Sequence, residues 1–402
     1  MTVSMNHRAA LVLHWSFFCH LAQRLPGLAG VLRCSELKAL LANGTGTASH
    51  EAYAKRYLFG DGSYQGLLCD YLAYGWSLDI IEETRFKASM GEFYLDYDRF
   101  DFQFASNISI DLVENLLARD SEVVGWGPPQ LGSKQVQALL LASNTEAVDM
   151  HPQQLIVSNK CDLEKIDRQT IVENFSSEYL LAKAFYSSNA TMPDGSGYRV
   201  FRKANWNKFV ELALSNDSWF SVRDGLIISE LIETRDPYLE CNNAVVHKVH
   251  VASGLTNTDE RAWRLVCKKL SAQLHLDRVG NSIKPISELF EFRAWSYAYL
   301  DDYREELEVV SDTFFNTPCL FSADFMIKPD GQLLFLEINK IAGTFLDHPE
   351  NGTHIPLADY MRLTTSGKLE NRLTRKNIID YRQKLSQVLG ASKDLNWLGV
   401  AQ

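Results

Sequence analysis

Three side chains in the last third of the chain carry oxygen ligands: Asp324, Glu337 and Asn339. Apolar runs at 320–327 and 333–338 flank a Pro-Asp-Gly turn, and this pattern predicts a β-hairpin that carries all three. Glu337 and Asn339 are two residues apart, so a strand would point both to one face, with Asp324 across the pair. Two carboxylates and one amide oxygen suit Mg²⁺, which binds few protein oxygens and leaves its other positions to phosphates and water.

The residues that follow the hairpin extend this pattern. Asp324, then Glu337-Ile-Asn339, then Gly343-Thr344 resemble the metal-binding signature of the ATP-grasp superfamily. Its members, such as D-alanine–D-alanine ligase, glutathione synthetase and biotin carboxylase, join a carboxylate to a nucleophile through an acyl phosphate. The resemblance implies ATP and Mg²⁺ as cofactors, with Mn²⁺ as a possible substitute. From the hairpin residues alone, an ordinary hairpin with a solvated acidic edge stays open as the alternative.

The resemblance implies a mixed α/β (α+β) chain with the ATP-grasp fold. It divides the 402 residues into an N-terminal α/β domain at 1–127, a central lid subdomain at 128–240, and a C-terminal antiparallel-sheet subdomain at 241–402. The last of these would carry the metal site and a terminal helix. The Gly-Pro-Pro sequence at 127–129 is a natural break between the first two parts. A chain of this length can hold two or three domains, each with its own core.

Two lysines precede the hairpin in an informative order. Lys134 opens a predicted helix just after the Gly-Pro-Pro break, and Lys183 ends the apolar strand predicted at 179–183. In ATP-grasp enzymes two lysines in such positions contact the nucleotide phosphates, and the resemblance gives Lys134 and Lys183 this role. A strongly anionic triphosphate needs local cations of this kind. Lys160 competes for the first position, but it lies closer to Lys183 than the family pattern requires.

The loop after Lys183 is polar and contains Gly195 and Gly197. It resembles the lid that folds over the phosphates, because glycine and serine allow backbone N–H groups to approach phosphate oxygens. The loop at 187–197 is longer and less rich in glycine than the usual family form. An ordinary hairpin loop is the alternative.

The segment 226–236 resembles the hinge that reads adenine. The resemblance implies that the adenine edge contacts main-chain groups of Glu230, Leu231 and Ile232. It also implies that Asp236 accepts hydrogen bonds from the ribose hydroxyls, with Glu233 and Glu240 as the next candidates. A buried strand with an acidic exit is the alternative.

Further cations are assigned by the same resemblance. Lys248 lies on a predicted strand and takes the place of a family cation that faces the phosphates. Several family members have an arginine two residues before the first metal acid, where it stabilises the acyl phosphate, but this chain has Ser322 there. Arg293 is our first candidate to replace it, because we expect it on a long helix that does not move with the lid. Arg199 is the second candidate.

Periodic apolar patterns predict the remaining elements. We expect helices at 35–42, 65–83, 110–118 (capped by Ser109), 133–141 (capped by Ser133), 205–214, 258–275, 287–312 and about 372–389. We expect strands, besides the hairpin, at 9–15, 123–126, 155–158, 179–183, 226–232 and 244–251.

Composition limits the class of protein. The chain is 46% apolar and 22% charged, as expected for a globular protein. Its net charge of −10 argues against nucleic-acid partners, which require a basic surface. The N-terminal apolar run is interrupted by polar residues and predicts no signal peptide, and no apolar run is long enough to predict a membrane span. The seven cysteines form no Cys-x-x-Cys pair and suggest reduced thiols in a cytoplasmic protein.

Together these patterns predict an ATP-dependent ligase that joins a carboxylate to an amine through an acyl phosphate, releasing ADP and phosphate. We expect small-molecule partners, with an amino acid or short peptide as the default, and a homodimer is possible. The first alternative is an ATP-grasp kinase that phosphorylates a small-molecule hydroxyl, which the absent arginine favours. The second is a nucleotide-binding regulatory protein without turnover, although such a protein would be free to lose its metal ligands.

Overall fold

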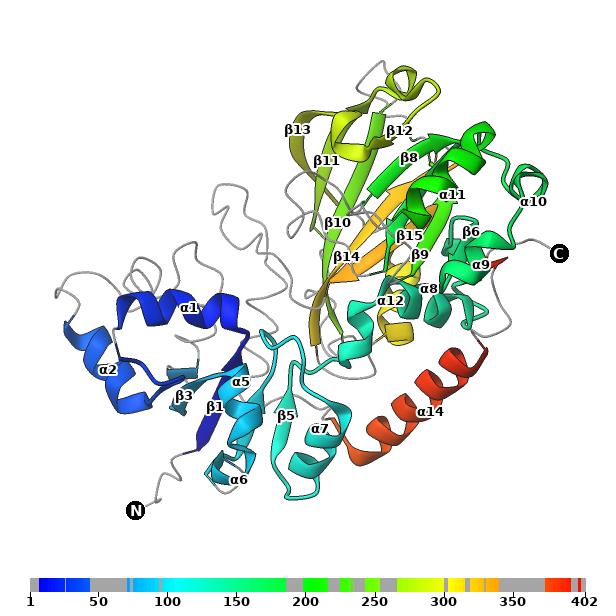
Figure 1. Ribbon diagram of the computed structural model, residues 1–402. Coiled ribbons are helices and arrows are strands. Elements are labelled where there is room, and N and C mark those ends of the chain that lie inside the picture. The colour runs from blue at the N-terminus through cyan, green and yellow to red at the C-terminus, as the bar shows by residue number, and fades with distance from the viewer. Residues whose placement is uncertain are drawn as a thin grey trace.

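A computed structural model describes residues 7–25, 27–43, 71–72, 75–93, 96–185, 198–215, 225–232, 234, 243–253, 266–299, 303–314, 319–328, 330–339, 373–391 and 397–398. The chain is a mixed α/β protein with several sheets, as predicted. Three sheets organise it, and each is built mainly from one stretch of the sequence (Figure 1).

The N-terminal sheet has the strand order β2-β3-β1-β4-β5. Pairing is parallel between β1 and β3, β1 and β4, and β4 and β5, whereas β2 is antiparallel to β3. Its strands are β1 (Arg8–Leu13), β2 (Val31–Leu32), β3 (Ser77–Glu82), β4 (Arg99–Asp101) and β5 (Glu122–Val124). Its helices are α1 (Trp15–Arg24), α2 (Cys34–Asn43), α5 (Glu83–Ala88), α6 (Met90–Phe93) and α7 (Ile110–Leu117).

The middle sheet is antiparallel in all its pairs, with the strand order β12-β8-β7-β9-β6-β16. Its strands are β6 (Gln154–Val157), β7 (Tyr179–Ala184), β8 (Tyr198–Arg202), β9 (Leu226–Glu230), β12 (Ile283–Pro285) and β16 (Trp397–Leu398). One face packs on α9 (Lys160–Glu164), α10 (Arg168–Asn174) and α11 (Trp206–Leu214) through a core that includes Leu180, Phe201 and Trp206.

The C-terminal sheet is also antiparallel, with the strand order β13-β11-β10-β14-β15. Its strands are β10 (Asn243–Ser253), β11 (Val266–Leu274), β13 (Phe290–Tyr299), β14 (Cys319–Ile327) and β15 (Leu333–Asn339). Three longer helices accompany this sheet: α8 (Lys134–Ala142), α12 (Arg304–Phe314) and α14 (Arg375–Ala391). In Figure 1, α14 begins near α7 of the N-terminal part and runs away from it beneath α8.

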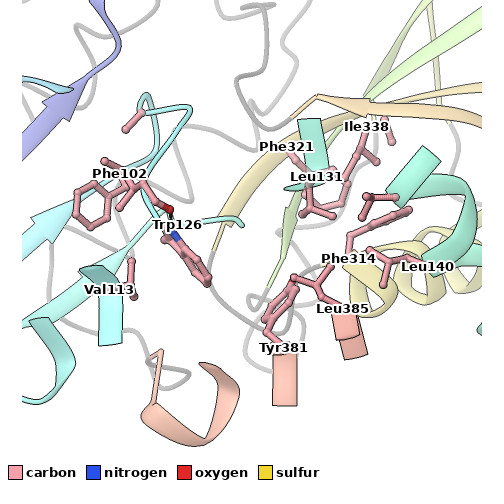
Figure 2. Packing of buried hydrophobic residues seen from close by; sticks show 14 of the residues in the cluster. Phe102, Val113, Trp126, Leu131, Leu140, Phe314, Phe321, Ile338, Tyr381 and Leu385 are labelled. Atoms are coloured by element: carbon pink, nitrogen blue, oxygen red, sulfur yellow. Dashed lines mark hydrogen bonds between the residues drawn. The ribbon is translucent and has the colours of Figure 1, made fainter. Parts of the chain in front are cut away.

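One large core joins the N-terminal and C-terminal parts. Phe102 and Trp126 of the first part belong to the same buried cluster as Phe321 and Ile338 of the hairpin. Tyr381 of α14 lies at the junction, with its ring centroid 6.0 Å from that of Trp126 (Figure 2). Because burial of such aromatic side chains dominates core energetics, this cluster fixes the hairpin relative to α8.

A smaller core lies between the middle and C-terminal sheets. Val200 and Leu231 of the middle part pack in one cluster with Leu274, Met326 and Leu334 of the C-terminal part. The faces of the two sheets that meet here carry the candidate site. The predicted domain division at residues 127 and 240 stays a prediction. The strands β12 and β16 lie within 241–402 but pair with β8 and β6, which lie within 128–240.

Three predicted helices are wrong over part of their ranges. The range 65–83 contains β3, the range 258–275 contains β11, and the range 287–312 contains β13 before α12 begins at Arg304. The other predicted strands and helices are present, with boundaries shifted by a few residues.

Candidate functional site

The strongest contact at the site is an ion pair between α8 and β15. Lys134 Nζ donates to Glu337 Oε2 at 2.5 Å, and the two side chains are 11% and 18% exposed. Burial lowers the pKa of Lys134, but the nearby Glu337 carboxylate and Tyr198 hydroxyl outweigh that effect and raise the pKa above its ordinary value. Lys134 is therefore a permanent cation at this position.

The second predicted lysine lies beside the first. Lys183 Nζ and Lys134 Nζ are 5.7 Å and 5.8 Å from the centroid of the Tyr198 ring, so this ring lies close to both ammonium groups. Burial lowers the pKa of Lys183 to about 8, aided by the Lys134 charge and opposed by Glu337 and Asp324. Two cations that are 49 positions apart in the sequence thus share the Glu337 carboxylate, and Lys183 also interacts with Asp324.

Backbone contacts explain why Lys134 lies near Lys183. Ser133 is the N-cap residue of α8, as predicted, but its side chain forms no capping hydrogen bond. Instead the Lys134 N–H donates to the Phe185 carbonyl at 3.1 Å, just beyond the end of β7. A helix leaves its first amides without partners, and here one of them ties α8 to the strand that carries Lys183.

Gly225 makes this junction possible. Its φ is +88°, and a Cβ there would lie 2.1 Å from the Phe185 ring. Its carbonyl accepts from the Phe185 N–H at 3.2 Å. Only glycine combines a positive φ with so close an approach, so Gly225 determines where Phe185 and the start of α8 lie.

The predicted hairpin is confirmed, and a β-bulge sets its chemistry. Asp324 pairs with Glu337 and Ser322 with Asn339, whereas Phe325 pairs with Phe335. Leu336 is therefore the extra residue of a bulge. Without it, strict alternation would place Glu337 on the face of Phe335, which belongs to the large core.

The bulge leaves Glu337 and Asn339 on the face of Asp324, while Ile338 returns to the core beside Phe335. The donor set on this face is two carboxylates and one amide, all hard oxygen ligands, and it fits Mg²⁺ or Mn²⁺. Among the residues that the structure describes, no group of three or more His, Cys, Asp or Glu side chains could hold a metal ion.

A side chain that the sequence patterns did not single out holds the strand between these ligands. Gln137 is buried on α8, one turn after Lys134. Its Oε1 accepts from the Ile338 N–H at 2.9 Å, and its Nε2 donates to the Ile338 carbonyl at 3.0 Å and to the Leu131 carbonyl at 2.7 Å. The sequence alone carries no distinctive signal for this role of Gln137.

Some main-chain groups of the predicted hinge already form hydrogen bonds within the middle sheet. The Glu230 and Leu231 amides donate to the carbonyls of Gln153 and Tyr179, at 3.2 Å and 3.0 Å. The Glu230 carboxylate accepts from Ser176 and Ser177, ahead of β7. Leu231 is buried and Ile232 half-buried, both against the core between the two sheets. Asp236, Glu233 and Glu240 lie outside the described residues.

The remaining cations are placed only in part. Lys248 lies on β10, where its Cα is the register partner of Asp324 on β14. The expected helix around Arg293 is wrong, because Arg293 lies on strand β13. It falls at the register shift between β11 and β13. Arg199 pairs with Ala182, and alternation places it on the helix-covered face, opposite to Lys183. The predicted lid at 187–197 lies outside the described residues, apart from Tyr198 that follows it.

A small pocket opens beside the two lysines. Its lining comprises Lys134, Gln137, Ala138, His151, Gln154, Lys183, Ile227, Phe335 and Leu336. His151 and Gln154 are buried, and neither was predicted from the sequence. Burial lowers the pKa of His151 to about 4, so its imidazole is neutral at physiological pH.

The sequence as a whole matches no family model and no curated protein. Solved structures of similar arrangement do exist. D-alanyl-alanine synthetase A from Vibrio cholerae is 12% identical, with a TM-score of 0.46, and the match covers 91% of this chain and 99% of that one. Macrocyclase MdnC from Microcystis aeruginosa, bound with the precursor peptide MdnA, is 11% identical over 90% and 100% of the chains, with a TM-score of 0.47.

A third structure is the ATP-grasp ligase PsnB complexed with a precursor variant, Mg and ADP. It is 14% identical over 75% of this chain and 94% of that one, with a TM-score of 0.44. Among the described helices, none is both long and apolar enough to cross a membrane.

Proposed function

We propose that this protein is an ATP-dependent ligase that joins a carboxylate to an amine and releases ADP and phosphate. The observation that carries this proposal is the convergence of Lys134 from α8 and Lys183 from β7 on the hairpin, where Glu337 interacts with both lysines and Asp324 with Lys183. Two half-buried cations opposite two carboxylates on a hairpin would suit a triphosphate together with a divalent metal ion.

The two lysines would bind the phosphates of ATP, and Tyr198 would keep their stems in place. The adenine edge would contact the Glu230 carbonyl and the Ile232 amide, because the Glu230 and Leu231 amides are already used within the sheet. We assign the ribose hydroxyls to Asp236, on the resemblance alone. The apolar surface of Ile232 and Leu336 would pack on the purine ring.

Asp324, Glu337 and Asn339 would hold Mg²⁺. When bound, the metal ion would neutralise phosphate charge and orient the triphosphate. The chain's own contribution is to fix these three side chains on one face, which the Leu336 bulge and the Gln137 hydrogen bonds do. Lys248, the register partner of Asp324, is our proposal for a further cation that faces the phosphates.

The proposed reaction has two bond-forming steps. A carboxylate oxygen of the substrate attacks the γ-phosphorus of ATP, the bond to the β-phosphate oxygen breaks, and ADP leaves with the electron pair. The amine nitrogen then attacks the acyl carbon, phosphate leaves, and the amine loses a proton. The protein positions reactants and screens charge, so no nucleophilic side chain is required. Arg293 stays our proposal for the cation at the acyl phosphate, since Arg199 lies on the opposite face from Lys183.

A kinase is the second candidate, and one observation favours it. Ser322 occupies the register position opposite Asn339, where several ATP-grasp members have an arginine for the acyl phosphate. Without a cation there, phosphoryl transfer to a hydroxyl is the simpler reaction. Amino acids or short peptides are the proposed ligase substrates, by family resemblance only.

Hydroxylamine distinguishes the two reactions. The purified protein is incubated with ATP, Mg²⁺, hydroxylamine and pools of carboxylates, and products are measured by mass spectrometry. A ligase will form a hydroxamate together with stoichiometric ADP and phosphate. A phosphorylated product without hydroxamate would establish the kinase instead. No ATP binding in calorimetry would exclude both.

A further inference from the structure

The pocket beside Lys183 contains buried polar atoms that the proposed chemistry does not use. Gln154 is 7% exposed and His151 is 8% exposed. Within the part of the chain that the structure describes, Gln154 Oε1 has no hydrogen-bond partner, and the His151 ring has only the backbone of Ala138 nearby to bond with. Buried polar groups normally have partners, because leaving one unpaired costs free energy. The Gln154 oxygen therefore calls for a ligand or a water molecule.

The place of Gln154 in the sheet defines what such a ligand could be. Gln154 lies on β6 opposite Ser229 of β9, one residue before the proposed hinge at Glu230. Leu155 and Val157 face the helix-covered core, so alternation puts Gln154 on the other face, with Ile227 and Lys183. Gln154 thus lies on the face where the hinge would hold a base, and next to one phosphate-binding lysine.

The lining combines apolar walls with a hydrogen-bond acceptor. Ile227 and Leu336 provide apolar surface, which suits a flat ring. The carbonyl oxygen Oε1 of Gln154 accepts but cannot donate, so its partner must present an N–H or O–H group. The exocyclic amino group of a 6-aminopurine is such a donor. In the orientation that the structure shows, a 6-oxopurine would present its oxygen to Oε1, so its binding would require the Gln154 amide to rotate and present Nε2 instead.

We propose that Gln154 accepts a hydrogen bond from the exocyclic amino group of ATP and selects 6-aminopurine over 6-oxopurine nucleotides at this site. This inference rests on the proposed nucleotide-binding function and adds a specificity-determining residue outside the hinge. His151 is a neutral ring at the same pocket and completes its polar end, with either tautomer offering one donor and one acceptor.

The test pairs a change in the protein with a change in the ligand. Dissociation constants for ATP and for purine riboside triphosphate, which lacks only the amino group, are measured by calorimetry with wild type and Gln154→Leu. The variant should weaken ATP binding by about three- to tenfold, as expected for one lost hydrogen bond, and leave the analogue unchanged. Inosine triphosphate should gain affinity relative to ATP in the same variant.

Two further variants keep the result interpretable. Gln154→Glu retains an acceptor oxygen and should keep the preference for ATP. Gln153→Leu changes the adjacent residue of the same strand region and should alter neither ligand. If Gln154→Leu misfolds, Gln154→Met provides the same loss of the acceptor with an unbranched side chain.

The outcomes separate this inference from the proposed function. If ATP binds to wild type and Gln154→Leu weakens both ligands equally or neither, Gln154 binds only a water molecule and the inference is wrong. If wild type binds neither nucleotide, the proposed function itself fails.

Discussion

Gln137 binds both main-chain polar groups of Ile338, through hydrogen bonds of 2.9 Å and 3.0 Å. Ile338 stands between Glu337 and Asn339 on β15, the last strand of its sheet. An edge strand has one row of main-chain groups without a neighbouring strand, and Gln137 supplies their partner here. One side chain of α8 thus fixes the strand that carries two of the three proposed metal ligands.

Gln137→Met should therefore destabilise the fold and weaken metal binding together. It keeps the length of the side chain but leaves buried main-chain groups of Ile338 and Leu131 without partners. This loss should lower the free energy of unfolding by about 1–3 kcal/mol. Urea titration measures the first effect, and calorimetry with Mn²⁺ measures the second. The matched control is Gln135→Met, on the same helix with a more exposed side chain, which should change neither. Normal Mn²⁺ affinity in a destabilised Gln137→Met would restrict Gln137 to a structural role.

Lys134→Ala and Lys183→Ala should each reduce ATP affinity. Each removes a charge-assisted contact to phosphate, worth about 1–3 kcal/mol in the binding free energy. Lys160→Ala is the matched control, because Lys160 is exposed at the start of α9 and lies outside the pocket lining. Calorimetry that finds a loss at Lys160 and none at the other two would assign the phosphate site elsewhere.

Glu337→Gln should abolish ATP turnover and leave the fold nearly intact. The amide has the same shape but removes the negative charge that Mg²⁺ and Lys134 both require. Because Glu337 raises the pKa of Lys134, the change should also lower that pKa. Turnover at saturating Mg²⁺ is compared with Glu305→Gln, an exposed acid on α12. Retention of most activity in Glu337→Gln would remove the hairpin from the mechanism.

The hairpin and both lysines could be predicted because they rest on local patterns and on family order. The bulge at Leu336 could not, since the apolar residues around it allow two registers and the buried core decides between them. Gln137 was missed for a related reason. A glutamine in the middle of a helix has no distinctive pattern until its strand partner is known.

The two wrong helices in the C-terminal part show a limit of periodicity. Val266, Leu270 and Leu274 of β11 are each four residues apart. This spacing places side chains on one face of a helix, and also on one face of a strand, where every second residue points the same way. The aromatic residues of β13 alternate at 290 and 292 and again at 295, 297 and 299, with a slip in phase between them. That slip coincides with the register shift near Arg293, and it was the signal for a bulged strand.

Gly225→Ala should destabilise the protein by about 1–3 kcal/mol and weaken ATP binding. An alanine at φ +88° is strained, and its Cβ would overlap the Phe185 ring. The main-chain carbonyl of Phe185 accepts the hydrogen bond from the Lys134 amide, so a shift of Phe185 would also displace Lys134. Gly390→Ala in α14 is the control, because no atom lies within 4 Å of a Cβ there. It should be neutral or stabilising. Equal stability of the two variants in urea would show that the Phe185 junction tolerates displacement.

ATP affinity should fall as the pH rises above about 8, because Lys183 loses its proton there. The protonated form attracts phosphate, so binding is fully supported below this pKa and lost above it. The free energy of unfolding changes in the opposite direction. Burial lowers the pKa of Lys183 from the ordinary 10.5 to about 8, so below pH 8 the folded protein carries the full cost of a buried charge. That cost is relieved as the pH rises from about 8 towards 10.5. Dissociation constants measured from pH 7.5 upward should show the fall in wild type and not in Lys183→Arg, which stays charged. Lys183→Met, with no titrating group, should bind weakly with a flat profile. A decline of equal size in all three proteins would assign the titration to another group.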